Sequence, residues 1–321
     1  MTEATRSTAS ARLANWGGVS RTADLGGPVH YVDFGGPAGA PRVVLVHGLG
    51  GSHLNWCLLG PRLVTDARVL AVDLVGFGLT HAQGRATTVR ANAAMLDRFV
   101  REIAGAPAIL VGNSMGGMVS VIQAVAHPDA VAGLVLIDPV LPLARGARPD
   151  RLVAATFLLY ALPRVGERYL ARRRATLTPR QIVQEVLNLC CAAPERVPED
   201  LVEASVALTE ERAAVGGADT AFLSAARSLL RMSARRRRYW AAMRALGSPV
   251  LLMSGEKDRL VSINAAREAA ARNPDWRFEV VPDVGHVPQL EKPDAVADLI
   301  LDWLGREGVA AARGAAAPRL A

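Results

Sequence analysis

Cysteine is scarce in this chain of 321 residues, and the few that occur do not suggest pairing. The three cysteines are Cys57, Cys190 and Cys191; their number is odd and two are adjacent, so they form no disulfide framework. No group of His, Cys, Asp or Glu has the spacing of metal ligands along the sequence. The sequence therefore predicts a protein of a reducing compartment that needs neither a metal nor a cofactor.

Long apolar runs are also missing. Residues 1–18 lack the apolar core of a secretory signal peptide, and no later run reaches the roughly 18 consecutive apolar residues of a transmembrane helix. These absences predict a cytoplasmic protein without stable membrane insertion. Residues 1–12 and 308–321 show no periodic apolar pattern, and we expect both ends to be disordered.

Lysine is almost absent, although the chain is basic. The 37 Lys and Arg outnumber the 30 Asp and Glu, yet only Lys257 and Lys292 are lysines. Enrichment in arginine together with alanine is typical of a coding bias, and no basic stripe is interleaved with aromatic residues, so we expect no nucleic-acid partner. The basic runs at residues 172–174 and 235–238 fit solvated helix faces. Attraction to anionic substrates or membrane surfaces is the alternative for these runs.

Half of the residues are hydrophobic, which is enough for one large core with an inserted subdomain. Short β-branched apolar runs, typical of strands buried on both faces, alternate with helical patterns. This alternation predicts an α/β fold with a mostly parallel sheet that is flanked by helices and binds ligands at the carboxyl ends of its strands. The predicted strands are residues 20–25, 29–34, 43–46, 69–72, 109–111, 134–137, 250–253 and 278–281. The predicted helices of this unit are residues 88–104, 115–126, 263–271 and 294–304.

One interval interrupts the alternation. Between about residue 142 and residue 245 the sequence holds helical patterns, such as residues 152–162 and 182–189, separated by prolines at positions 163, 179 and 198. We interpret residues 142–245 as a helical cap that is inserted into a core made of residues 13–141 and 246–307.

The segment GNSMG, residues 112–116, lies where a predicted strand runs into a predicted helix. A serine on so sharp a turn needs small neighbours two residues away on each side, and both Gly112 and Gly116 meet that need. The pattern is a G-x-S-x-G elbow, which presents the hydroxyl of Ser114 above a helix N-terminus that favours developing negative charge.

Three further stretches end predicted strands at the same edge of the sheet. The first is a glycine-rich loop, HGLGG, that begins at His47. The second places Asp258 after the strand at 250–253, and the third places His286 after the last strand. The chain order Ser114, Asp258, His286 matches that of a nucleophile-elbow triad, and the long interval between the first two holds the inserted segment.

Over residues 29–304 the sequence resembles the α/β-hydrolase superfamily, in its serine-nucleophile branch with a helical cap. The segments HGLGG, DLVGFG, GNSMGG, GEKDRLV and GHVPQLEKPD stand where that superfamily has its recurring segments. The resemblance implies that Ser114 is the nucleophile, His286 the general base and then acid, and Asp258 the residue that orients the imidazole. It also implies an oxyanion hole made by the backbone N–H groups of Leu49 and Met115.

The same resemblance bears on three further residues. Asp73, in DLVGFG, looks like a structural turn residue, and His47 is expected to shape the oxyanion loop rather than to take part in the chemistry. Asp138 is the alternative acid, because some members of the superfamily take their carboxylate from that earlier strand end. We favour Asp258.

Serine at position 114 argues against the chemistry of the related dehalogenases and epoxide hydrolases, which form an alkyl ester through a carboxylate. The expected function is hydrolysis of a carboxylic ester of a small or lipid-like apolar substrate through an acyl-enzyme. One alternative is C–C bond hydrolysis of ring-cleavage products, since GNSMGG also resembles that subgroup, although HGLGGS and Val287 depart from it. Another is a non-catalytic small-molecule receptor on a hydrolase scaffold. The oligomeric state is left open.

Overall fold

An eight-stranded sheet forms the centre of the molecule in the computed structural model, which describes residues 16–142 and 150–308. The strand order is β1-β2-β4-β3-β5-β6-β7-β8, and all pairs from β4 onward are parallel, whereas β2 runs antiparallel to both of its neighbours. The strands are β1 Val19–Asp24, β2 Pro28–Gly35, β3 Arg42–Val46, β4 Arg68–Val72, β5 Ala108–Asn113, β6 Val131–Ile137, β7 Val250–Gly255 and β8 Arg277–Val281. The predicted α/β class and all eight predicted strands are confirmed.

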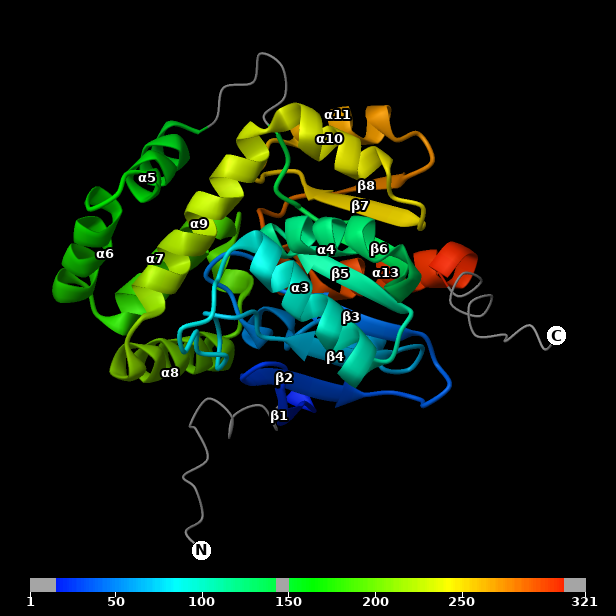
Figure 1. Cartoon of the computed structure of the whole chain (residues 1–321), viewed down its shortest axis with the longest axis horizontal. Helices are drawn as coiled ribbons and strands as arrows, with labels where there is room; N and C mark the ends of the chain where they lie inside the picture. Colours follow the sequence, from blue (N-terminus) through cyan, green and yellow to red (C-terminus); the bar gives the residue numbers. More distant parts are fainter. Residues whose placement is uncertain (1–15, 143–149, 309–321) are drawn as a thin grey trace, which may run out of the picture.

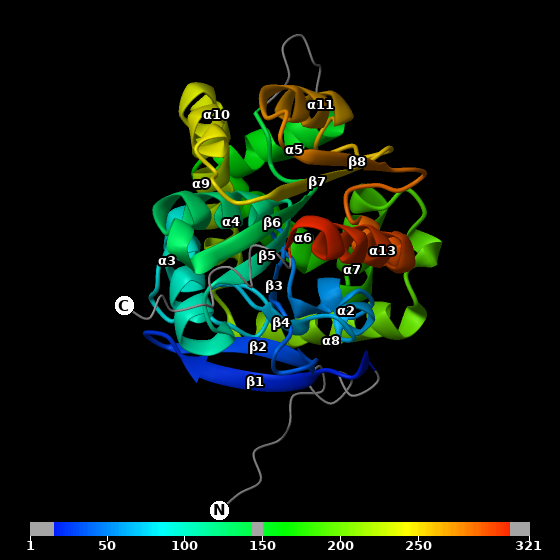
Figure 2. The same cartoon turned by 90° about the vertical axis from the view of Figure 1, so that its right-hand side faces the viewer.

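The central strands are buried on both faces, as their continuous apolar runs predict. Successive side chains of a strand point to opposite faces, so Val44 and Val46 of β3 belong to one apolar cluster and Val43 and Leu45 to another. Helices cover both clusters. Figure 2 shows α3 (Val89–Phe99), α4 (Met115–Ala126) and α10 (Arg236–Arg244) on one side of the sheet and α2 (Gly60–Leu63) and α13 (Pro293–Trp303) on the other.

The ends of these helices follow local sequence signals. The hydroxyl of Thr88 accepts a hydrogen bond from Ala91 N and so caps α3. The Ser262 hydroxyl caps α11 (Ile263–Arg272) through Asn264 N in the same way. The helix predicted for residues 88–104 ends earlier than expected, since the last turn, Val100–Ala104, is a π-helix.

Six α-helices join β6 to β7, and the described residues of this interval contain no strand. Five of them, α5 to α9, lie together beyond one end of the strands, whereas α10 packs against α4 (Figure 1). The buried residues of α10 belong to the cluster that α4 helps to form, so the helical interval and the core are in contact there. The five are α5 Arg151–Ala161, α6 Val165–Thr176, α7 Pro179–Cys190, α8 Glu199–Val215 and α9 Ala218–Ala234.

The predicted division into cap and core stays a prediction. The predicted disordered ends lie outside the described residues, apart from Gly308, which closes the last helical turn, Leu304–Gly308. In the described part of the chain, no helix combines the length and the apolar character that a bilayer-spanning segment requires.

Candidate active site

Ser114 occupies a strained turn between β5 and α4. Its backbone has φ 54° and ψ −118°, a conformation that non-glycine residues rarely adopt and that persists only where the surroundings enforce it. A Cβ at Gly112 would lie 2.7 Å from the carbonyl group of Gly116, and a Cβ at Gly116 would overlap the carbonyl oxygen of Val46. The two glycines of the motif are therefore required by the packing of the turn.

The hydroxyl of Ser114 stays available in this turn. The side chain makes no capping hydrogen bond to α4, although it stands at the N-terminus of that helix. The backbone is held from β6, because Ser114 N donates to Ile137 O at 3.0 Å and Val140 N donates to Ser114 O at 3.1 Å. These two hydrogen bonds fix the turn, and the residue as a whole is 8% exposed.

The glycine-rich loop after β3 lies directly beside this serine. A Cβ at Gly48 would come within 3.0 Å of the Ser114 Cβ. His47 donates from Nδ1 to Gly48 O at 2.8 Å and accepts Leu74 N at its Nε2 at 3.0 Å. Burial lowers the pKa of His47 to about 4, so the ring is neutral and links this loop to the one after β4. The directions of the N–H groups of Leu49 and Met115 remain a prediction.

His286 and Asp258 meet at the carboxyl ends of β8 and β7. His286 Nδ1 lies 2.8 Å from Asp258 Oδ2, and the two side chains are 4% and 0% exposed. The other oxygen of Asp258 accepts hydrogen bonds from Leu260 N at 2.7 Å and Val261 N at 3.1 Å. The carboxylate is thus fixed, and its free direction is filled by the imidazole.

The backbone of His286 is held by two segments that are distant in sequence. Asn113, the residue before the elbow serine, donates from Nδ2 to His286 O at 3.0 Å and to Ile137 O at 3.1 Å. His286 N donates to Cys190 O, at the end of α7, at 2.6 Å. The histidine loop is therefore tied both to the elbow and to the inserted helices.

Glu291 reinforces the same junction, and the sequence analysis missed it. This carboxylate, 5% exposed, accepts hydrogen bonds from Gly285 N at 2.6 Å and from Ala192 N and Ala193 N at 2.9 Å each. The stretch around it, VPQLEKP, also holds a glutamine and a lysine, so the sequence gives no signal that this carboxylate is buried and needs several donors.

The alternative acid, Asp138, lies next to Asp258. Side-chain atoms of Asp138, Asp258 and His286 that could bind a metal ion all lie within 4.8 Å of one another. Asp138 has φ 42° and accepts Gly255 N at 2.9 Å and the Ser254 hydroxyl at 3.2 Å. Burial and then the charge of Asp258 raise the pKa of Asp138 well above its ordinary value. The environment thus favours the protonated form of Asp138.

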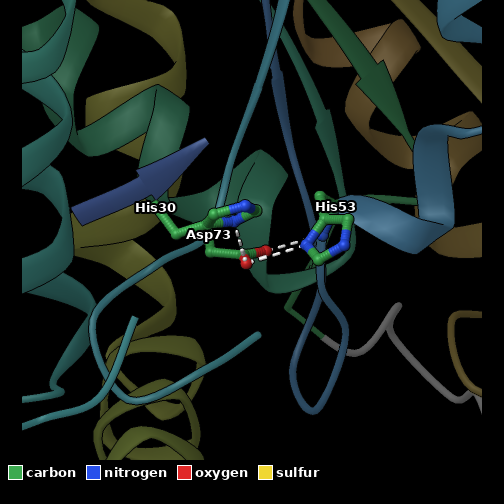
Figure 3. Close-up of side chains that lie close together, drawn as sticks. All are labelled: His30, His53 and Asp73. Carbon is green, nitrogen blue, oxygen red and sulfur yellow. Dashed lines mark hydrogen bonds and ion pairs between the residues drawn. The ribbon is translucent and has the colours of Figure 1, made fainter. Parts of the chain in front are cut away.

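A second buried cluster supports the loops around the site. Figure 3 shows Asp73 between His30 of β2 and His53 of the turn that follows the glycine-rich loop. Asp73 Oδ2 lies 2.8 Å from the Nδ1 atom of each histidine, and Asp73 Oδ1 accepts His53 N at 2.6 Å. Burial raises the pKa of Asp73, but His53 and His30 outweigh burial and hold it well below its ordinary value. Two histidines and an aspartate are residue types that bind metal ions, and here they lie close together. The Nδ1 atoms of both histidines, however, already hydrogen-bond to Asp73 Oδ2.

The inserted helices also contact the loops beside the site. Arg212 of α8 donates to Gly76 O at 2.6 Å and to Gly78 O at 2.5 Å, in the loop after β4. A Cβ at Gly50 would lie 3.3 Å from the ring of Phe222 on α9. Helices α8 and α9 therefore contact the loops after β3 and β4.

Comparisons with known proteins agree with this fold. A family model described as alpha/beta hydrolase fold matches residues 41–293. The chain is 32% identical over 265 residues to a pimeloyl-[acyl-carrier protein] methyl ester esterase of Aromatoleum aromaticum, covering 82% of this chain and 97% of the relative. A thermophilic esterase from Thermogutta terrifontis superimposes with a TM-score of 0.67 at 26% identity, covering 90% and 98% of the two chains. The Cfl2 protein of Burkholderia cenocepacia has the same fold, with a TM-score of 0.76 at 23% identity over 89% and 96%.

Proposed function

This chain belongs to the α/β-hydrolase family, and from that membership we propose that it is a serine hydrolase that cleaves a carboxylic ester through an acyl-enzyme. The observation that supports the proposal most is the hydrogen bond between His286 and Asp258 beside the elbow, where Asn113, the residue before Ser114, donates to His286 O. The strained φ of Ser114 supports it further, because such strain is found where a fold must present a reactive group.

The proposed reaction has two halves. His286 Nε2 accepts the proton of the Ser114 hydroxyl while Oγ attacks the ester carbonyl, and the tetrahedral intermediate collapses as His286 returns that proton to the departing alcohol. Water then gives up a proton to His286 and attacks the acyl-enzyme, and the acid leaves as Ser114 regains its proton. Backbone N–H groups of Leu49 and Met115 are proposed to stabilise the oxyanion in both halves.

We assign the orienting role to Asp258 and not to Asp138. The hydrogen bond between His286 Nδ1 and Asp258 Oδ2 favours the tautomer whose Nε2 is free to accept a proton. Asp138 is occupied by Gly255 N and the Ser254 hydroxyl, and its raised pKa favours the neutral form, which stabilises an imidazolium poorly. Its position beside Asp258 suits a protonated carboxyl group that donates a hydrogen bond to Asp258.

The proposed substrate is a small or lipid-like apolar ester, and helices α5 to α9 are proposed to form a cap above it. Two of the matched relatives are described as esterases, which supports ester chemistry for this chain. The test is a series of p-nitrophenyl esters of increasing acyl length, with a ring-cleavage dienoate assayed in parallel. We expect turnover of the esters and none of the dienoate. Turnover of the dienoate alone would favour the C–C hydrolase, and binding without turnover would favour the receptor.

A further inference from the structure

Helix α5 carries two apolar faces, of which the protein buries one. Val153, Phe157 and Tyr160 follow one another at helical spacing. Val153 is buried, and Phe157 and Tyr160 pack with residues of α9, where Tyr160 lies against Phe222 with ring centroids 5.1 Å apart. The other face carries Leu152 and Leu158, and Leu162 follows as the residue just after the helix; all three side chains are exposed. Contact with α9 therefore explains why the first face is apolar. The second face has no partner among the described residues.

The exposed face is unusual for this molecule. Leu152 is 63% exposed, Leu158 61% and Leu162 44%, and Val165 at the start of α6 is 39% exposed. These are four of the nine large apolar side chains that are exposed in the described chain, and they fall within one short stretch of sequence. Single exposed leucines need no explanation, but a group of them marks a surface that meets something apolar.

Exposed arginines follow this apolar face in the sequence. Arg168 and Arg172 lie four residues apart on α6, and Arg164 is the residue just before that helix; all three are exposed. None of the three makes an ion pair with a described residue. Their neighbours Arg173 and Arg174 do, with Glu185 and Asp219. We call Leu152, Leu158, Leu162, Val165 and these three arginines the α5–α6 patch. Figure 1 shows that both helices form the outermost layer at this end of the molecule, beyond α9.

From this combination we propose that the α5–α6 patch docks the protein on an anionic lipid surface. Leucines with neighbouring unpaired arginines are the composition with which a surface helix binds the boundary between acyl chains and negatively charged headgroups. A second copy of the chain fits the patch less well, because a two-fold interface would bring the arginines of both copies together. The inference stands independently of the proposed reaction, since none of these side chains belongs to the site around Ser114.

Sedimentation with lipid vesicles tests the proposal. We expect the protein to bind vesicles that contain phosphatidylglycerol, to bind pure phosphatidylcholine weakly, and to dissociate as salt increases. Each arginine near an anionic surface should strengthen binding roughly fivefold. Replacing both Arg168 and Arg172 by alanine should therefore weaken binding about 30-fold. The double variant Leu152→Ser/Leu158→Ser should weaken it about 10-fold or more.

Matched variants serve as controls. Arg237→Ala/Arg238→Ala removes the same charge from exposed positions on α10, and Val19→Ser/Val215→Ser removes exposed apolar side chains elsewhere. We expect both controls to bind like the wild type and all variants to keep its melting temperature. The proposal is overturned if the wild type does not bind anionic vesicles, or if the control variants lose as much binding as the patch variants. A dimer that dissociates on substitution of the leucines, without vesicle binding, would assign the patch to self-association.

Discussion

The two neighbouring carboxyl groups, Asp138 and Asp258, differ in their partners and therefore in their expected roles. Asp258 accepts two backbone N–H groups and faces the imidazole, whereas Asp138 sits deeper and is pushed toward its neutral form. Sequence order alone left both residues as candidates, since each follows a strand of the same sheet. Their separate environments provide the physical distinction.

We expect Asp258→Asn to lower kcat by up to about 10⁴-fold with little change in KM, because the amide favours the wrong imidazole tautomer. Asp138→Asn should reduce kcat much less and lower the free energy of unfolding by about 1 kcal/mol, since an amide can still accept the hydrogen bond of Gly255 N. Both variants are measured for kcat, KM and unfolding by denaturant. An inactive Asp138→Asn enzyme beside an active Asp258→Asn enzyme would move the acid to the earlier strand.

At the scale of elements, the histidine loop and the end of α7 share one tight junction. Only glycine fits at position 285, because a Cβ there would overlap the carbonyl oxygen of Cys190. That oxygen is the acceptor for His286 N. The backbone at Cys190 therefore helps to fix the position of the His286 backbone.

Gly285→Ala should separate these two segments and lower kcat by about 10-fold to 100-fold, since a shift of about 1 Å at a catalytic group has an effect of that order. Gly247→Ala is the matched control, because nothing lies within 4 Å of its Cβ position. Activity and melting temperature are measured for both. Equal activity of the two variants would show that the junction with α7 does not position His286.

The Asp73 cluster joins β2, the turn after the glycine-rich loop and the loop after β4. The pKa of Asp73 is lowered in the folded state, so the ionised carboxylate stabilises the fold at every pH above the ordinary pKa of aspartate, about 3.9. This stabilisation is lost as the pH falls through the lower pKa of the folded state. Asp73→Asn should cost about 3 kcal/mol or more near neutral pH, because the amide loses the charge and has one acceptor oxygen for donors that now use both oxygens of Asp73.

The measurement is chemical denaturation between neutral pH and pH 3, with the exposed Asp275→Asn as control. We expect the difference between Asp73→Asn and the wild type to shrink as the medium becomes acidic. A difference that is constant with pH would mean that the charge of Asp73 does not stabilise the fold.

At the scale of the whole molecule, the sheet could be predicted from the sequence because each strand carries its own apolar run. The run at residues 109–111 and the elbow GNSMG are local signals, and local signals suffice to place Ser114 after a buried strand. The acid was harder to choose, since the distance between Asp258 and His286 depends on how two strands align.

Other parts of the site could not be predicted because they depend on packing between distant segments. His30 and His53 are ordinary in sequence and acquire a role only where the fold brings them to Asp73. The same holds for Glu291, whose three donors come from Gly285 and from residues 192–193 in the inserted helices. The exposed leucines of α5 fitted the helical pattern, and only the fold shows which of its faces is covered.

The central claim is that Ser114 forms a covalent acyl intermediate, and a fluorophosphonate probe tests it most directly. We predict that the probe labels the wild type at Ser114, and that Ser114→Ala is unlabelled and about 10⁵-fold to 10⁶-fold slower in ester hydrolysis with an unchanged melting temperature. Ser120→Ala, which changes a fully buried serine on the same helix, should keep the label. Labelling at another serine, or an active Ser114→Ala enzyme, would contradict the account.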